Sequence, residues 1–242
     1  MAYSMYTRCM RKGEVVSELT FELVNGQKVT VFVRSALNGG YAGRSQDDVA
    51  AHVAELAELG VPAPTTTPCL YPVAPYLVSQ ADSVPAQHGH TSGEAEWAMI
   101  VTHDDVLLTV ACDHTDRDLE VHGVAWSKQA APDIVGRQAW RLSDVADRID
   151  SLTLTAWVSD GESWTEIQRG TLAELLTPQY WLDALRSRDL LEPGTVLLSG
   201  TIPMHPGVDQ FGASWRVELG DPATGAVIRC QYDVRRLPDP VA

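Results

Sequence analysis

The chain has 242 residues, 45% hydrophobic and 21% charged, which is enough for one sizeable core and too apolar for a disordered chain. Acidic residues outnumber basic ones by 32 to 18, and the formal charge of −14 argues against nucleic acid or an anionic membrane as partner. The four cysteines form no CxxC pair, which argues against a zinc knuckle and suits a reducing compartment. With no signal peptide or long apolar run, we expect a cytoplasmic protein.

The first expected elements are a hairpin and a helix. Residues 18–34 alternate apolar and polar on either side of Asn25-Gly26, a dipeptide favoured in two-residue turns, and predict a β-hairpin. From residue 45 to residue 59 apolar side chains recur at helical spacing, with a serine as candidate N-cap and Gly60 as the stop. This pattern predicts a helix.

Five prolines between residues 61 and 78 predict an extended surface segment. We therefore expect a small N-terminal unit over residues 1–62, linked to a main domain over residues 63–242. Short runs rich in β-branched residues indicate that the main domain is β-rich, of the α+β class, with helices near 142–149 and 171–188. The expected strands fall within residues 94–101, 105–112, 151–159, 194–202, 214–219 and 226–234.

Three acidic residues are candidate metal ligands. Glu94 and Glu96 alternate along an expected strand, so their carboxylates project from one face. Neighbouring like charges repel unless a cation lies between them, and carboxylate oxygens suit Mg2+, Mn2+ or Ca2+ better than zinc. Asp113, after the next expected strand, can supply a third ligand. The alternative is an exposed strand end and a polar turn whose acids are simply solvated.

Other side chains are candidates for acid–base chemistry. His52 and Glu55 lie three residues apart on the expected helix and share a face, as an imidazole base oriented by a carboxylate requires. Beside a metal, Lys128 can bind a carboxylate or stabilise an enolate. His88 and His90 are either extra ligands or part of a polar loop. The alternative for each of these residues is an ordinary solvated surface side chain.

Taken together, the motifs resemble the fumarylacetoacetate hydrolase superfamily, in family order over residues 41–235. GEAEWAMIV resembles its ExE strand, DHTDRDLE its D-x-[ST]-x-R-D loop, and AGRSQDDVAAHVAEL its GRNY…H-x-x-E segment. SKQ resembles its lysine segment, and GTVLLSGTIP its GD-x-[IV]-x-x-GTP strand and turn. The resemblance implies a metal site of Glu94, Glu96 and Asp113, a water-activating dyad of His52 and Glu55, an assisting Lys128, and substrate contacts from Arg44 and Thr201.

Several positions depart from the family pattern. Two extra residues separate Arg44 from His52, and Tyr71 stands where relatives commonly have a lysine before proline. The family's GTP turn reads GTIP. The chain is therefore expected to represent a divergent branch.

The resemblance also implies a fold and an activity. The expected fold is a mixed β-roll core with a small N-terminal domain, in a homodimer. The expected cofactor is a divalent cation, Mg2+ before Mn2+ or Ca2+, and the expected substrate is a small 2-oxo acid. The expected reaction is hydrolysis of a carbon–carbon bond in an acylpyruvate-like acid. Decarboxylation, hydration or isomerisation of a 2-oxo acid, and non-catalytic metabolite binding, remain as alternatives.

Overall fold

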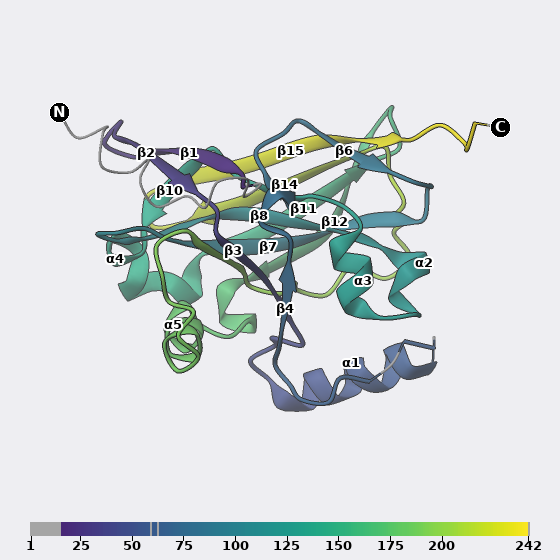
Figure 1. The fold of residues 1–242 in the computed structure, drawn as a ribbon, viewed down its shortest axis with the longest axis horizontal. Helices are drawn as coiled ribbons and strands as arrows, with labels where there is room; N and C mark the ends of the chain where they lie inside the picture. The colour runs from purple at the N-terminus through teal and green to yellow at the C-terminus, as the bar shows by residue number, and fades with distance from the viewer. Residues whose placement is uncertain (1–15, 59, 62, 242) are drawn as a thin grey trace.

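The computed structural model describes residues 16–58, 60–61 and 63–241, without the side chains of His52 and Leu56. Two β-sheets lie together, and the helices gather along one side of them (Figure 1). The larger sheet has the order β2 (Lys28–Phe32), β1 (Glu18–Leu23), β10 (Gln138–Arg141), β8 (Val106–Asp116), β7 (Thr91–Val101), β13 (Thr195–Leu198), β3 (Ser35–Gly40) and β4 (Cys69–Val73), with β9 (Asp133–Val135) on β8 and β5 (Val78–Ser79) on β9.

The smaller sheet and the helices complete the fold. The smaller sheet has the order β12 (Trp164–Thr171), β11 (Thr153–Ser159), β14 (Ser214–Asp221), β15 (Ala226–Arg236) and β6 (Ser83–Ala86). The α-helices are α1 (Gln46–Glu58), α2 (Arg117–Glu120), α3 (Val124–Gln129), α4 (Leu142–Val145) and α5 (Pro178–Arg186), and the 3-10 helices are η2 (Pro75–Leu77), η3 (Ala146–Ser151) and η4 (Leu172–Glu174). Within the described residues, no helix has the length and hydropathy that a membrane span requires.

The long antiparallel strands β7 and β8 form the centre of the molecule, and nearly all their residues are buried. Side chains alternate between two cores because a strand has a period of two. Trp97 and Met99 belong to the core shared with the smaller sheet, where Trp215 lies, whereas Ala98 and Ile100 belong to the core on the opposite face. Burial on both faces explains why residues 97–101 read as one continuous apolar run.

The hairpin and the first helix are confirmed. β1 and β2 pair in antiparallel register around a turn in which Gly26 has a φ of +78°, a conformation that glycine adopts without strain. α1 begins after Ser45, whose hydroxyl accepts a hydrogen bond from the Asp48 amide at 3.3 Å. β1 pairs in parallel with β10, and β3 with β13, so these N-terminal strands belong to the larger sheet. The division into domains at residue 62 stays a prediction.

In the rest of the chain, all six expected strands are present, as β7, β8, β11, β13, β14 and β15. The proline-rich segment is only partly extended: it contributes β4, an edge strand, as its missing amide donors require, and then forms the 3-10 helix η2. The patterns missed β12 because it is also an edge strand, with many polar and exposed residues. The fold is β-rich α+β, as expected.

Candidate metal centre

The structure brings the three predicted ligands together. Glu94 on β7 lies directly opposite Asp113 on β8, and Glu96 lies two residues further along the same face of β7. One carboxylate oxygen from each residue lies within 4.8 Å of the others. Asp113 belongs to β8 and does not follow it as a polar turn, because the strand continues to Asp116. The register of two strands therefore builds the cluster.

The carboxylate environment fits a hard divalent cation. Glu96 and Asp113 are completely buried, and only 13% of the Glu94 side chain is exposed. The Gly200 amide donates to Glu96 Oε2 at 2.8 Å, but Glu96 Oε1 is buried and has no hydrogen-bond partner. A buried carboxylate oxygen without a partner is costly, and a cation would satisfy it. Three carboxylates are a donor set suited to Mg2+, Mn2+ or Ca2+.

The two glutamates differ in their preferred charge. Burial raises the pKa of Glu96 well above its ordinary value, and the negative charge of Asp113 raises it further. Burial also acts to raise the pKa of Glu94, but the positive charges of Lys128 and Arg117 outweigh it and lower that pKa to about 2. The cluster without a cation therefore carries less negative charge than three carboxylates would, and a bound cation would favour ionisation of Glu96.

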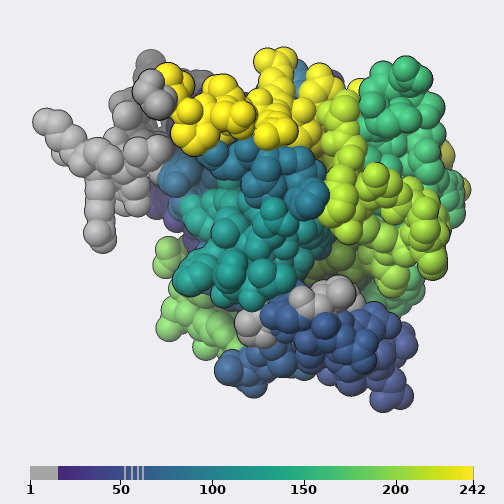
Figure 2. Space-filling model, turned by 90° about the vertical axis from the view of Figure 1, so that its right-hand side faces the viewer, coloured from purple at the N-terminus to yellow at the C-terminus, as the bar shows by residue number. Residues whose placement is uncertain are grey.

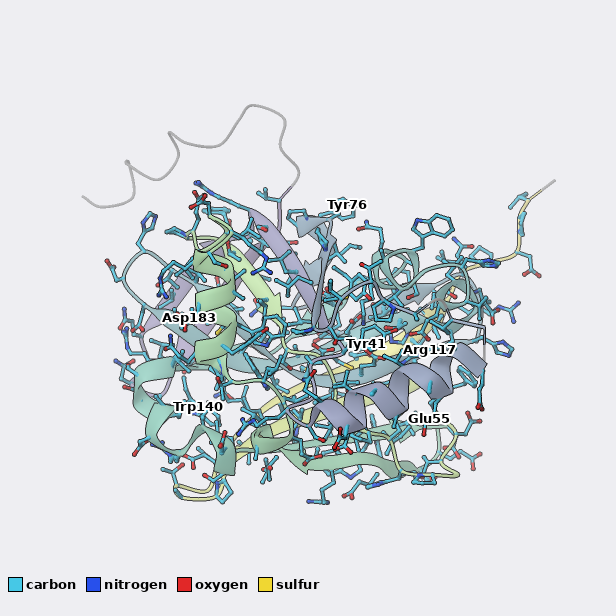
Figure 3. The ribbon with its side chains drawn as sticks, turned by 90° about the horizontal axis from the view of Figure 1, so that it is seen from below. Tyr41, Glu55, Tyr76, Arg117, Trp140 and Asp183 are labelled. Carbon is cyan, nitrogen blue, oxygen red and sulfur yellow. The ribbon has the colours of Figure 1, made fainter. Side chains whose placement is uncertain are left out.

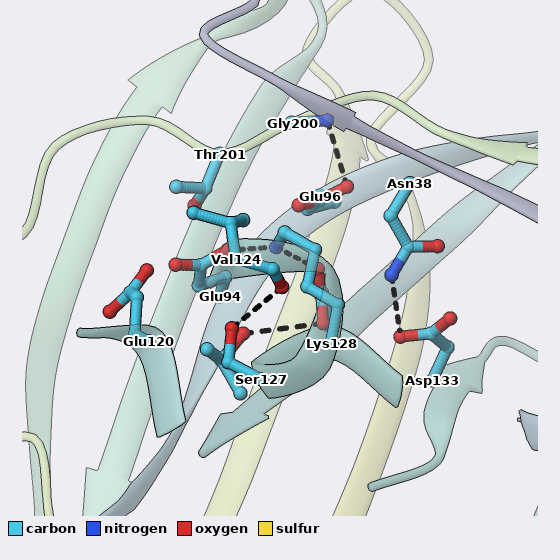
Figure 4. Close-up of polar contacts among 12 residues, drawn as sticks. Asn38, Glu94, Glu96, Glu120, Val124, Ser127, Lys128, Asp133, Gly200 and Thr201 are labelled. Atoms are coloured by element: carbon cyan, nitrogen blue, oxygen red, sulfur yellow. Dashed lines mark hydrogen bonds and ion pairs between the residues drawn. The ribbon is translucent and has the colours of Figure 1, made fainter. Parts of the chain in front are cut away.

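Two cations hold the cluster together: the buried Lys128, whose contacts are shown in Figure 4, and Arg117, whose side chain is 15% exposed. Lys128 on α3 donates from Nζ to Glu94 Oε2 at 3.1 Å and forms a short ion pair with Asp113. Arg117, at the start of α2, donates to Glu94 Oε1 at 2.8 Å and to Glu120 Oε2 at 3.1 Å. The structure thus places Lys128 at the acidic cluster. Its role in substrate binding or enolate stabilisation stays a prediction.

A buried pair that the sequence analysis missed adjoins this cluster. Asn38 on β3 donates to Asp133 Oδ1 on β9 at 3.1 Å, while Asp133 Oδ2 and Asn38 Oδ1 have no partner. Burial raises the pKa of Asp133 well above its ordinary value, and the charge of Asp113 adds to this. The available signal was Asn38 itself, a polar residue after Ala36 and Leu37, which is also typical of a structural hydrogen bond.

The loop after β13 lies against the ExE strand, as Thr201 shows. Its hydroxyl donates to the Ala95 carbonyl at 2.9 Å and accepts from Gln168 Nε2 at 2.8 Å. Gly200 has a φ of +85°, and a Cβ on it would lie 2.9 Å from the Ala42 Cβ, so only glycine fits this approach. Thr201 therefore lies next to the cluster, and its predicted substrate contact remains untested.

Of the predicted dyad, the side chain of His52 lies outside the described residues, and Glu55 is exposed on α1 (Figure 3). Arg44 makes a bidentate ion pair with Asp150, at 2.8 Å for both hydrogen bonds. Arg44 also donates to the carbonyls of Leu175 at 2.9 Å and Leu172 at 3.1 Å. These contacts connect Arg44 to η3 and η4 and involve no member of the acidic cluster. The functional roles of these three residues stay predictions.

His88 and His90 contact acids other than the three candidate ligands. His88 Nε2 lies 3.0 Å from Asp116 Oδ2, and His90 Nδ1 lies 3.2 Å from Asp118 Oδ1. Asp116 also caps α2 by accepting from the Leu119 amide at 3.1 Å. The polar-loop interpretation of the two histidines therefore fits their contacts.

Comparison with solved structures finds the same fold at low sequence identity. A crystal structure of Cg1458 with inhibitor is 18% identical, covers 88% of this chain and 84% of its own, and has a TM-score of 0.61. The structure of 2-keto-3-deoxy-D-arabinonate dehydratase complexed with magnesium and 2,5-dioxopentanoate is 17% identical, covers 84% of this chain and 74% of its own, and has a TM-score of 0.56. The structure of 4-oxalocrotonate decarboxylase from Pseudomonas putida G7, complexed with calcium and acetate, is 15% identical, covers 83% of this chain and 77% of its own, and has a TM-score of 0.50.

These structures belong to the fumarylacetoacetate hydrolase superfamily, so the chain has the fold that its motifs predict. No curated protein matches the chain. Residues 39–232, most of the chain, match the family described as a protein of unknown function, DUF2848. The chain therefore belongs to the DUF2848 family.

Proposed function

We propose that the protein is an enzyme that uses a divalent cation, Mg2+ foremost, to act on a small 2-oxo acid. The observation that carries this proposal is the buried cluster of Glu94, Glu96 and Asp113, with its unpartnered glutamate oxygen and its adjoining lysine. The magnesium and calcium complexes of the dehydratase and decarboxylase with the same fold support it.

The roles of the chain's residues follow from their contacts. Glu94, Glu96 and Asp113 would hold the cation, which when bound neutralises charge on the carboxylate and 2-oxo oxygens of the substrate. Arg117 keeps Glu94 ionised and oriented. The Lys128 ammonium already lies among these carboxylates. It would donate a hydrogen bond to the 2-oxo oxygen and so stabilise the negative charge that develops there.

The reaction we propose first is that of a lyase, decarboxylation or dehydration, because both named reactions among the structural neighbours are of this kind. The second candidate is hydrolysis of a carbon–carbon bond in an acylpyruvate-like acid. The spacing of His52 and Glu55 on α1 favours it, since Glu55 would orient His52 to take a proton from water. A homodimer, which the family resemblance implies, remains part of the proposal and is testable by light scattering.

The first experiment measures Mg2+ and Mn2+ binding to chelator-stripped protein by calorimetry, with and without oxalate as a mimic of a 2-oxo acid. We expect binding that oxalate strengthens and that Glu96→Gln abolishes, while Glu22→Gln, an exposed glutamate on β1, leaves it unchanged. Absence of binding, or binding that survives Glu96→Gln, would contradict the proposed metal site.

The second experiment separates the reactions. Metal-loaded protein is incubated with oxaloacetate, with 3-deoxy-2-oxo sugar acids and with acetylpyruvate, and the products are identified. Turnover of either of the first two supports a lyase, and turnover of acetylpyruvate supports a hydrolase. If His52→Ala left acetylpyruvate hydrolysis intact, the water-activation role would be wrong. Binding of oxalate without turnover of any 2-oxo acid would favour a metabolite-binding protein.

A further inference from the structure

Two tyrosines lie close to the acidic cluster and have no part in the function proposed above. Tyr71, on β4, pairs with Asn38 on β3, and Tyr41 follows the end of β3. The Tyr71 ring packs over Gly40, where a Cβ would lie only 2.5 Å from Tyr71 Cε2. A glycine at residue 40 therefore makes room for this ring position.

The backbone of Tyr41 is in an unfavourable conformation for its residue type. Its φ is +56°, in the left-handed region that favours glycine and is rare for bulky residues. A glycine there would relieve the strain, as glycines already do at other turns of this chain. Backbone strain of this kind concentrates at functional sites. The strained conformation therefore indicates a functional role for the Tyr41 side chain.

Both hydroxyl groups lie in the electrostatic field of the cluster. Burial raises the pKa of Tyr41, and Glu120 raises it further, while the positive charge of Lys128 acts in the opposite direction. Burial likewise raises the pKa of Tyr71, and Lys128 opposes this too. Each phenol is half-buried and therefore neutral at physiological pH.

The elements that carry the tyrosines are joined to the lysine helix. The amide of Ala74, next to β4, donates to Gln129 Oε1 at 2.9 Å, and Gln129 follows Lys128 on α3. In the view from below, Tyr41 and Arg117 are labelled close together, beside α1 (Figure 3). On this face, α1, the α2–α3 segment and the loop near residues 200–213 lie next to one another (Figure 2).

The cations at this end already have anionic partners among the described residues. Lys128 is bound to Glu94 and Asp113, and Arg117 to Glu94 and Glu120. A substrate anchored by one carboxylate at the metal centre would present its other end to two neutral phenols with Glu120 nearby. A second carboxylate there would meet no described free cation and would be repelled by the glutamate.

We propose that Tyr41 and Tyr71 contact the distal end of the substrate and select a 2-oxo acid with one carboxylate and an uncharged distal chain over one with two carboxylates. Of the two lyase reactions proposed above, this selects dehydration, because metal-assisted decarboxylation of a 2-oxo acid consumes a second carboxylate. This assignment rests on the proposed function, since it requires the 2-oxo acid to be held at the metal centre. Phenol hydroxyls and rings suit hydroxyl, carbonyl or apolar distal groups, which they contact without a charge.

The test compares two 2-oxo acids of equal length, 2-oxopentanoate and 2-oxoglutarate, as competitors of oxalate bound to the Mg2+-loaded protein. We expect 2-oxopentanoate to bind about tenfold more tightly or better. Tyr71→Lys adds a cation and should shift the ratio at least about tenfold toward 2-oxoglutarate, with oxalate affinity little changed. Tyr180→Lys, at an exposed tyrosine on α5, is the matched control and should leave the ratio unchanged.

Tyr41→Gly provides an independent variant that should fold, because glycine tolerates the left-handed backbone. It should keep the melting temperature and oxalate binding, while 2-oxopentanoate binds about tenfold more weakly. An unchanged ratio in Tyr71→Lys, or equal binding of the two acids to the wild type, would overturn the assignment alone. Loss of oxalate binding by the wild-type protein would overturn the proposed function and this assignment with it.

Discussion

The two faces of β7 and β8 are buried by different interactions, one by apolar packing and the other partly by paired charges. Toward the smaller sheet, Trp97, Met99 and Trp215 form an apolar core. On the opposite face, an apolar region gives way near one end to Glu94, Glu96 and Asp113, whose charges are partly compensated by Lys128 and Arg117. Apolar burial stabilises without a partner, whereas buried charge is tolerated only when it is compensated. The same two strands therefore serve as core and as candidate active site.

The largest expected effect is on the apolar face. Trp97→Ala removes a completely buried indole and should lower the free energy of unfolding by about 3–5 kcal/mol. Urea denaturation measures this loss, and calorimetry with Mg2+ should show little change in metal affinity because the side chain points away from the cluster. A loss below about 1 kcal/mol would mean that the two sheets are less tightly packed than the structure indicates.

The second effect concerns the charged face. Lys128→Met leaves two largely buried carboxylates without their ammonium partner and should cost about 3 kcal/mol in metal-free protein. Saturating Mg2+ should recover part of this loss, since a cation at the cluster supplies the missing positive charge. Thermal unfolding with and without Mg2+ tests this, with Arg137→Met, an exposed cation, as control. If Mg2+ stabilised Lys128→Met no more than the wild type, the ammonium and the cation would not be compensating the same charges.

The smallest effect is on the exposed side of the smaller sheet. Arg229 Nε donates to Glu218 Oε1 at 2.7 Å, in a cross-strand pair on β15 and β14. Because water screens such a pair, Arg229→Ala should cost less than about 1 kcal/mol by urea denaturation. A cost comparable to that of Lys128→Met would show that burial does not determine what the loss of an ion pair costs at these two positions.

Local patterns were sufficient for many elements of the fold. The Asn25-Gly26 turn, the helix capped at Ser45 and the six alternating or apolar strands follow from the chemistry of neighbouring residues. Two edge strands were harder: β4, which contains a proline, was expected only as an extended segment, and the polar β12 was missed. Asp133 was also missed because its partner Asn38 lies 95 residues away, and no local pattern reports such a contact.

The sequence by itself determined that Glu94 and Glu96 share a face, because a strand has a period of two, and its ordered motifs indicated the superfamily fold. Only the tertiary structure decided that Glu94 lies opposite Asp113, that α3 brings Lys128 to both, and that Tyr71 on β4 pairs with Asn38 on β3. The reason is that strand register and helix placement depend on pairing and packing between distant segments, which local residue chemistry does not specify.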